Sequence, residues 1–586
     1  MPAGKAGSVS AIYLGQDEAP PARRGRLLDP WVLFTLAAAG GVALPVLVVA
    51  GFVFVPTGEI WDHLAATVLP RYIGNSLLLM VGVGSGVLVI GVGTAWLVTL
   101  CRFPGRLLFE WVLLLPLAVP AYVIAYSYAT LLDFAGPVQT SLRDLFGWGR
   151  ADYWFPNLRS PGGAIAMMTL VLYPYVYLLS RAAFLEQSAC VLEVSRTLGC
   201  SPWRGFFRVA LPLARPAVAA GVALALMEAL NDFGAVQHFG VDTFTTGIYR
   251  TWLGMREPAA AAQLAAILML FIAAIFLLER WSRGRRGFAQ SSTRYRPLPQ
   301  YHLTGLRAAL AMLACVAPVL LGFVVPALSL GRGVWLTARE WVDARFLGYA
   351  FNSFILATIA ALLAVGVAVL MAYALRLRRT RVTLAAVRVA GMGYAVPGSV
   401  IAVGVMLPLA WIDNSIDSWM RATFGLSTGL IFSGTIYAVI AAYLVRFLAL
   451  SFNTVEASLT KVTASMDYAA RALGHGPGAT LRRVHMPMIR GSLLTAGLLV
   501  FVDVMKELPA TLILRPFGFN TLAVRAYELA SDERLEEAST AALAIVAAGL
   551  VPVLVLSISI ARSRRRTPAL PVHAPTVLMR AIPEGV

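Results

Sequence analysis

The sequence predicts an all-α polytopic membrane protein with about twelve transmembrane helices, arranged as two parallel six-helix repeats. Three observations lead to this fold class. Apolar residue types make up 59% of the 586 residues, and charged types make up 13%, about half the usual share in soluble domains. Apolar runs long enough to cross a bilayer recur along the chain, and one segment returns 275 residues later. This composition excludes a soluble enzyme, a disordered chain and a fibrous protein.

The individual spans follow from length, because a helix needs about 20 mostly apolar residues to cross the hydrocarbon layer. The first run is too long for the apolar region of a signal peptide, so we expect it to be a retained span. The first half contains runs near 31–55, 74–100, 108–132, 163–184, 213–232 and 260–279. The second half contains runs near 306–330, 352–375, 384–411, 429–450, 491–514 and 540–561.

The net charge of +18 predicts orientation rather than nucleic-acid binding, because basic residues of membrane proteins collect in cytoplasmic loops. With twelve spans, the arginine-rich loops all fall on one side and the acidic loops on the other. Both termini are then cytoplasmic. The basic segments are 23–26, 102–106, 181–208, 280–286, 376–381, 471–483 and 562–566.

The internal repeat has an offset of 275 residues. This offset relates one set of residues to another in strict register. The related pairs are Arg196 and Arg471, Gly199 and Gly474, Pro202 and Pro477, Pro212 and Pro487, and Asp232 and Glu507. Because each half holds an even number of spans, the two halves are predicted to run parallel, related by an axis along the membrane normal.

Each copy of the repeated segment lies in the cytoplasmic loop between the fourth and fifth spans of its half. A glycine that ends an amphipathic stretch is typical of a helix C-cap, and a proline shortly after it is typical of the first turn of a new helix. We therefore expect a helix, a bend and a short helix that ends near Pro212 or Pro487. The basic residues of this unit are Arg204 and Arg208 in the first copy, and Arg482 and Arg483 in the second.

This segment resembles the signature loop of the permease subunits of binding-protein-dependent ABC importers, which reads E-A-A, three residues, Gly, nine residues, Ile, one residue, Leu-Pro. The first copy supplies Glu193 and Gly199. The second copy has Tyr468 where the pattern has the acid, and Asp467 stands one place earlier. The resemblance implies a type I importer permease fold, and it implies that Asp467 substitutes for the missing acid.

The resemblance also implies partners. Each loop would seat its short helix on one of two ATP-binding cassette subunits, which would bind ATP and magnesium, and a periplasmic binding protein would deliver the substrate to this bacterial inner membrane protein. The chain itself contains no G-x-x-x-x-G-K-[ST] motif, so we expect no ATPase activity, no catalytic residue and no cofactor of its own. The residues expected to couple the loops to the ATPases are Glu193, Gly199, Pro202, Arg204, Arg208, Pro212, Asp467, Gly474, Pro477, Arg483 and Pro487.

The predicted organisation places a cytoplasmic tail at 1–29 and a linker at 283–304. The first six-helix domain covers 30–282 with a coupling loop at 186–212. The second covers 305–562 with a coupling loop at 455–487, and a cytoplasmic tail follows at 563–586.

The fused arrangement, with the segments 172–178 and 228–246, looks like the ferric iron permeases. Fused thiamine permeases share this architecture, so thiamine or another small solute stays open as the substrate. An ion-coupled secondary transporter is a further alternative, although such carriers need no paired docking loops.

Ionisable residues at membrane depth mark functional sites. Asp232 and Glu507 occupy matching places at the ends of two spans, and Glu228 and Tyr175 lie nearby in the predicted topology. Fe(III) is a hard cation, and hard cations prefer oxygen ligands. We therefore predict that these four residues line the substrate pathway, while the metal ligands stay unknown.

Overall fold

The computed structural model describes residues 29–186, 197, 201–283, 300–341 and 343–565. Eleven helices in these ranges are long and apolar enough to cross a membrane, and one further pair, bent by 90°, brings the number to twelve. The prediction of about twelve spans is therefore confirmed. Helices dominate both halves, and a two-residue parallel pairing of β1 (Cys101–Arg102) with β2 (Tyr301–His302) joins the loop after α3 to the linker.

The helices follow the chain in two series. Those of the first half are α1 (Pro30–Phe52), α2 (Glu59–Thr67), α3 (Leu69–Leu100), α4 (Arg106–Val112), α5 (Ala121–Leu132), α6 (Pro137–Phe146), α7 (Pro161–Glu186), α9 (Pro202–Gly205), α10 (Leu211–Asn231), α11 (Gly234–His238), α12 (Phe244–Tyr249) and α13 (Pro258–Arg283). Those of the second half are α14 (Gly305–Val319), α15 (Val325–Trp341), α16 (Ala344–Leu377), α17 (Arg381–Gly391), α18 (Gly398–Phe424), α19 (Ile436–Leu459), α20 (Ala464–Ala472), α21 (Pro477–Thr480), α22 (Met486–Met505), α23 (Pro509–Leu514), α24 (Leu522–Ser531) and α25 (Leu535–Arg565).

Short 3-10 and π-helical turns connect several of these helices. They are η1 (Leu115–Ala118), η2 (Phe206–Ala210), η3 (Arg250–Gly254), η4 (Leu320–Val324), η5 (Gly393–Ala395) and η6 (Leu481–His485).

Two predicted spans differ from the structure in the same way. The third run (108–132) is broken at Pro120, and the ninth run (384–411) is broken at Pro397, where α18 begins. Both prolines are extended, with ψ of 148° and 143°, and the residue before each is extended too. A proline has no N–H to donate and disfavours helix at the preceding residue. The break is therefore a repeated feature of the two halves, which continuous apolar composition hides.

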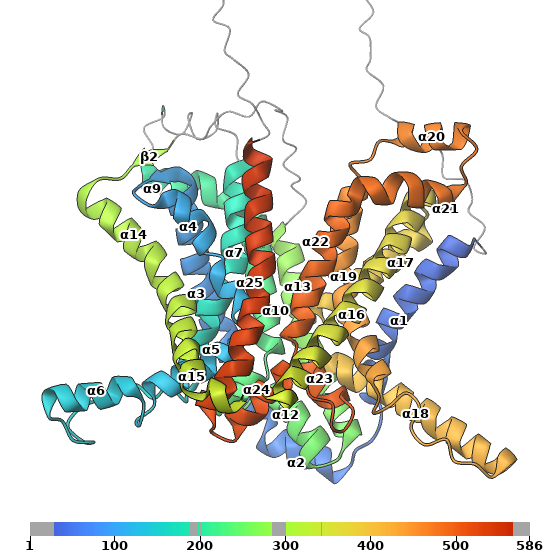
Figure 1. The fold of residues 1–586 in the computed structure, drawn as a ribbon, viewed down its shortest axis with the longest axis horizontal. Helices are drawn as coiled ribbons and strands as arrows, with labels where there is room; N and C mark the ends of the chain where they lie inside the picture. Colours follow the sequence, from blue (N-terminus) through green and yellow to red (C-terminus); the bar gives the residue numbers. More distant parts are fainter. Residues whose placement is uncertain (1–28, 187–196, 198–200, 284–299, 342, 566–586) are drawn as a thin grey trace, which may run out of the picture.

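The two halves exchange their first helices. Helix α1 packs against α16, α17 and α18 of the second half, and α14 contacts α3 and α4 of the first half (Figure 1). Each half is thus held by a helix that belongs to the other in sequence. The helices α9, α20 and α21 of the repeated loops lie at one end of the molecule, and α2, α6 and α12 lie at the opposite end (Figure 1).

Candidate transport cavity and coupling loops

The second repeated loop folds as a helix, a bend and a new helix, which confirms the local prediction. Helix α20 ends in a left-handed glycine, Gly474, with φ of 79°. The N–H of His475 donates to the carbonyl of Ala470 at 3.0 Å, which is the hydrogen bond that closes this type of helix end. Gly476 then caps α21, and Pro477 occupies its first turn.

An ion-pair cluster fixes this loop to the spans. Asp467 in α20 accepts a hydrogen bond from Arg376 Nε of α16 at 2.9 Å, and its other oxygen lies 2.6 Å from His485 Nε2. Arg376 also donates to the carbonyl of Leu459 at 2.6 Å. The acid at position 467 therefore ties α20 to the end of α16 and to η6, and Arg376 in turn ties the end of α16 to the end of α19.

The first repeated loop is described in part. Glu193 and Gly199 lie outside the described residues, so the predictions made for them have no structural counterpart here. Helix α9 begins at Pro202, and Ser201 Oγ accepts a hydrogen bond from Arg204 N at 3.4 Å, as expected of an N-cap. Arg204 and Arg208 are exposed, like Arg482 and Arg483 of the second copy, so both loops present basic residues at the same end of the molecule.

The prediction that the short helices end near Pro212 and Pro487 is wrong. In both halves the helix continues through the proline, over residues 203–231 in the first half and 477–505 in the second. A π-helical turn precedes each proline, η2 before Pro212 and η6 before Pro487. A proline ring clashes with the carbonyl four residues earlier in a regular helix, and the wider turn relieves this contact. Each loop helix is consequently continuous with a span.

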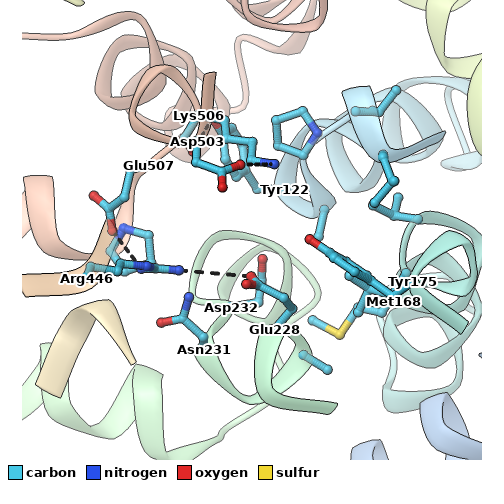
Figure 2. A pocket seen from close by; sticks show the side chains of 18 of the residues that line it. Tyr122, Met168, Tyr175, Glu228, Asn231, Asp232, Arg446, Asp503, Lys506 and Glu507 are labelled. Carbon is cyan, nitrogen blue, oxygen red and sulfur yellow. Dashed lines mark hydrogen bonds and ion pairs between the residues drawn. The ribbon is translucent and has the colours of Figure 1, made fainter. Parts of the chain in front are cut away.

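A cavity of about 100 Å³ lies among spans from both halves (Figure 2). Side chains of α5, α7 and α10 line it from the first half, and side chains of α19, α22 and the segment after α22 line it from the second. The polar residues in this lining are Tyr122, Tyr175, Glu228, Asn231, Asp232, Tyr394, Arg446, Asp503, Lys506 and Glu507. The cavity therefore gathers all four predicted pathway residues.

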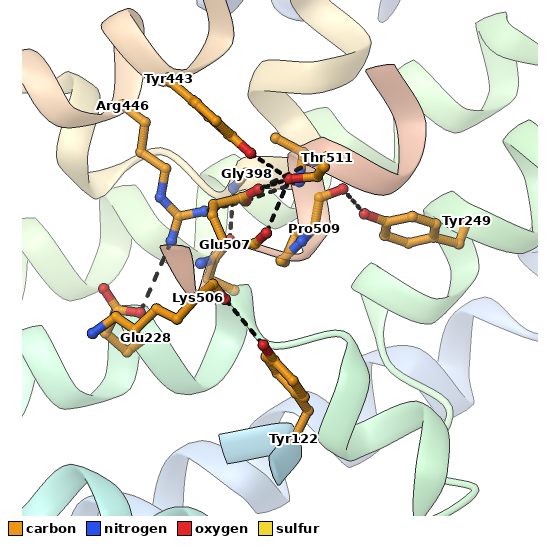
Figure 3. Close-up of polar contacts among 12 residues, drawn as sticks. Tyr122, Glu228, Tyr249, Gly398, Tyr443, Arg446, Lys506, Glu507, Pro509 and Thr511 are labelled. Carbon is orange, nitrogen blue, oxygen red and sulfur yellow. Dashed lines mark hydrogen bonds and ion pairs between the residues drawn. The ribbon is translucent and has the colours of Figure 1, made fainter. Parts of the chain in front are cut away.

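Glu507 is the centre of a buried hydrogen-bond network (Figure 3). Its side chain is 2% exposed and accepts from Arg446 Nη1 at 3.1 Å. It also accepts from the backbone N–H of Ala510 at 2.9 Å and from the hydroxyl of Thr511 at 2.7 Å. These bonds satisfy both carboxylate oxygens and cap α23, so Glu507 fixes the segment that follows α22.

Asp232 has the corresponding place in the first half. Its Oδ1 accepts from the N–H groups of Ala235 at 2.8 Å and Val236 at 3.3 Å, which caps α11. The two residues that the repeat pairs are thus both helix caps, and each holds the short helix that follows the break in its span.

A second pair of carboxylates is related by the same offset of 275 residues: Glu228 of α10 and Asp503 of α22. Glu228 lies 4.0 Å from Arg446 Nη2, and Asp503 lies 2.8 Å from Lys506 Nζ. Both carboxylates line the cavity and are partly exposed, at 25% and 19%. Figure 2 shows both ion pairs at the cavity, so Glu228 and Asp503 are the acids best placed to meet a substrate.

The two halves also meet through a hydrogen bond between a side chain of the cavity lining and a backbone N–H. Asn231 of α10 accepts from the N–H of Gly398 at 2.6 Å, where α18 begins. A Cβ on Gly398 would lie 2.8 Å from Glu507 Oε1 and closer still to Arg446 Nη1. Only glycine lets the chain pass this close to the ion pair.

We therefore expect Gly398→Ala to lower stability by about 1–3 kcal/mol, the usual cost of overpacking. The measurement is the fraction of purified protein that elutes as a single species after heating. Gly366→Ala in α16 is the matched control, because nothing lies within 4 Å of its added Cβ. Equal heat resistance of the two variants would show that the ion pair has room to move.

Comparison with known proteins identifies the family of the chain. The family described as the inner membrane component of binding-protein-dependent transport systems matches twice, at residues 87–286 and 364–567. The chain belongs to this family. The two matches correspond to the two repeats, so this is a fused two-domain ABC importer permease, a multi-pass protein of the inner membrane.

Its relatives differ in what their names say they carry. The Fe(3+)-transport system permease protein FbpB 2 of Haemophilus influenzae is 28% identical over 83% of this chain and 90% of the relative. The molybdenum transport system permease protein ModB of Escherichia coli is 30% identical over 34% of this chain and 89% of the relative. The sulfate transport system permease protein CysT of Escherichia coli is 30% identical over 33% of this chain and 71% of the relative. The iron permease matches along most of its length, and the molybdenum and sulfate permeases each match about a third of this chain.

Sequence reasoning missed Arg446, Asn231 and Tyr394. Arg446 carried a usable signal, since it is an ionisable residue inside the predicted span 429–450. Asn231 and Tyr394 carried none, because single polar residues near helix ends are common. Among the described residues, no group of three or more His, Cys, Asp or Glu side chains could hold a metal ion.

Proposed function

We propose that this permease carries ferric iron, received from a periplasmic binding protein, across the inner membrane by alternating access. Two ATPase subunits on the cytoplasmic side supply the energy, and both termini of the permease lie on that side. In this proposal the chain provides the transport pathway, and its partner subunits hydrolyse ATP.

The charge of the cavity lining carries the choice of substrate. Four carboxylates line the cavity, from Glu228, Asp232, Asp503 and Glu507, against two cations, Arg446 and Lys506. An excess of negative charge in a site of low dielectric attracts a cation and repels molybdate or sulfate. Carboxylate and phenol oxygens are also the ligands that a hard cation prefers. This lining supports iron over the molybdenum and sulfate that the names of the other two relatives give.

The size of the cavity supports an ion over thiamine. Its volume of about 100 Å³ lies below the roughly 300 Å³ at which pockets begin to hold drug-sized organic molecules. A metal ion needs far less room than a molecule with two aromatic rings. Within the part of the chain that the structure describes, no group of three or more His, Cys, Asp or Glu side chains could coordinate iron in the cavity. Selectivity for iron would therefore come from the binding protein that loads the permease.

The coupling loops support the energy source. Both loops lie at the same end of the molecule, expose pairs of arginines and continue directly into a span (Figure 1). A continuous helix transmits a push at its end as a movement of the whole span. The sequence contains no G-x-x-x-x-G-K-[ST] motif for binding ATP. We therefore infer that one ATPase subunit binds each coupling loop.

The test is ATP hydrolysis by the reconstituted complex of permease and ATPase subunits. We expect stimulation of several-fold by an iron-loaded binding protein, and none by binding proteins loaded with molybdate or thiamine. Stimulation by molybdate alone would overturn the assignment of iron. Uptake that persists without ATP, driven by an ion gradient, would instead identify a secondary transporter.

A further inference from the structure

The cavity contains a lysine, and lysine is rare in this protein. Of the 48 basic residues in the sequence, three are lysines: Lys5, Lys461 and Lys506. Lysine and arginine differ in more than charge. Arginine is a rigid planar fork suited to a fixed ion pair, whereas lysine is a compact charge on a flexible four-carbon stem. A lysine at the cavity therefore supplies a cation that is able to move.

The two cations of the cavity are held very differently. Arg446 is 9% exposed and bonded to Glu507, whose own oxygens are fully satisfied. Lys506 is 27% exposed, and its ammonium forms an ion pair with Asp503 at 2.8 Å. Lys506 also lies at the end of α22, where the regular helix stops. Arg446 is thus a fixed part of the scaffold, and Lys506 is attached by a flexible stem at a break in the chain.

The surroundings of the Lys506 ammonium are oxygen-rich. The ammonium lies 2.8 Å from the carboxylate of Asp503, and Glu228 and Tyr175 line the same cavity. Tyr175 in turn lies beside Tyr394. Two carboxylates related by the repeat, one from each half, and two phenols therefore line the same cavity as the ammonium. This set of hard oxygen donors suits a metal cation as well as it suits an ammonium group.

We propose that Lys506 is a tethered counter-cation whose ammonium occupies, in this conformation, the position that the transported cation takes between Asp503 and Glu228. The inference rests on the proposed function, because it assumes a cationic substrate. Carboxylates at membrane depth are costly without a partner. When the substrate enters, the ammonium swings out and the metal neutralises the two acids. When the metal leaves, the ammonium returns to the two acids. The acids are therefore neutralised at every stage, and the returning ammonium helps to release the metal.

A terbium titration of the purified permease in lipid nanodiscs tests this proposal. Tb³⁺ is a hard trivalent cation whose emission is sensitised by nearby tyrosine rings, and Tyr122 and Tyr175 line the cavity. We expect Lys506→Met to lower the half-saturating Tb³⁺ concentration at least tenfold, because the competing ammonium is gone. Lys506→Gln should act in the same direction, which guards against misfolding of one variant. Adding Asp503→Asn to Lys506→Met should cancel the gain.

Asp144→Asn, a change on the exposed part of α6, is the matched control and should leave the titration unchanged. Coincident titrations of the natural protein and both Lys506 variants, all eluting as single species, would overturn the proposal. If iron-loaded binding protein stimulates ATP hydrolysis while these titrations coincide, the counter-cation fails and the iron assignment stands. If the titrations shift as expected without stimulation by iron, the counter-cation holds for a different cation.

Discussion

A Gly474→Val permease is expected to insert normally into the membrane and to lose at least nine-tenths of its uptake. Gly474 closes α20 with φ of 79°, a conformation that is a strained outlier for a β-branched residue. Nothing lies within 4 Å of a Cβ at this position, so the damage comes from the backbone and not from a clash. The substitution would redirect the chain between α20 and α21 and displace the helix that we propose to seat on the ATPase.

Two substitutions separate this account from general damage to the loop. Gly474→Asn should keep most of the uptake, because asparagine tolerates the left-handed conformation. Gly478→Ala lies four residues later in open space with an ordinary backbone and should be neutral. The measurement is binding of the ATPase subunits to the purified variants, together with uptake in vesicles. Full uptake by Gly474→Val would show that the bend at Gly474 is not needed for coupling.

The repeat explains why so much of the architecture could be predicted from the sequence. Twelve apolar runs and one segment repeated in register predict twelve spans and two parallel halves, and local rules place Gly474 and Pro477 correctly. The breaks at Pro120 and Pro397 could have been predicted from proline chemistry, but the continuous apolar composition around them favoured unbroken spans. The continuation of helix through Pro212 and Pro487 depends on π-helical turns, which leave no mark in composition.

The candidate site was predictable as a region but not in the roles of its residues. The repeat singled out Asp232 and Glu507 as pathway residues, and the structure uses both carboxylates as helix caps. An acid at membrane depth is predicted to have a functional role. Depth alone does not distinguish an acid that caps a helix from an acid that faces the substrate. That distinction depends on which side of a helix end each oxygen faces, as Glu228 and Asp503 show. The ion pair of Glu228 with Arg446 joins two different spans, which spacing in one sequence does not reveal, whereas Asp503 pairs with Lys506 three residues later at the end of the same helix.

Arg446→Met should have the largest effect on stability of any single change at the cavity. It leaves the buried carboxylate of Glu507 without its cation and Glu228 without its neighbour. Breaking a buried ion pair from one side costs about 3–5 kcal/mol, because the remaining charge is desolvated and unpaired. We expect the variant to be recovered at a few per cent of the natural yield, or to aggregate on mild heating in detergent.

The double variant Arg446→Met, Glu507→Gln decides whether this loss comes from the stranded charge. Glutamine keeps an acceptor oxygen for the N–H of Ala510 and the hydroxyl of Thr511 while it removes the charge, so the cap of α23 survives in part. Replacing both members of a buried pair is commonly far less costly than removing one. The double variant should therefore resist heating better than Arg446→Met alone, as measured by the fraction that elutes as a single species. If it is no better, Arg446 stabilises the fold through packing, and the charge balance of the cavity matters less than the proposed function requires.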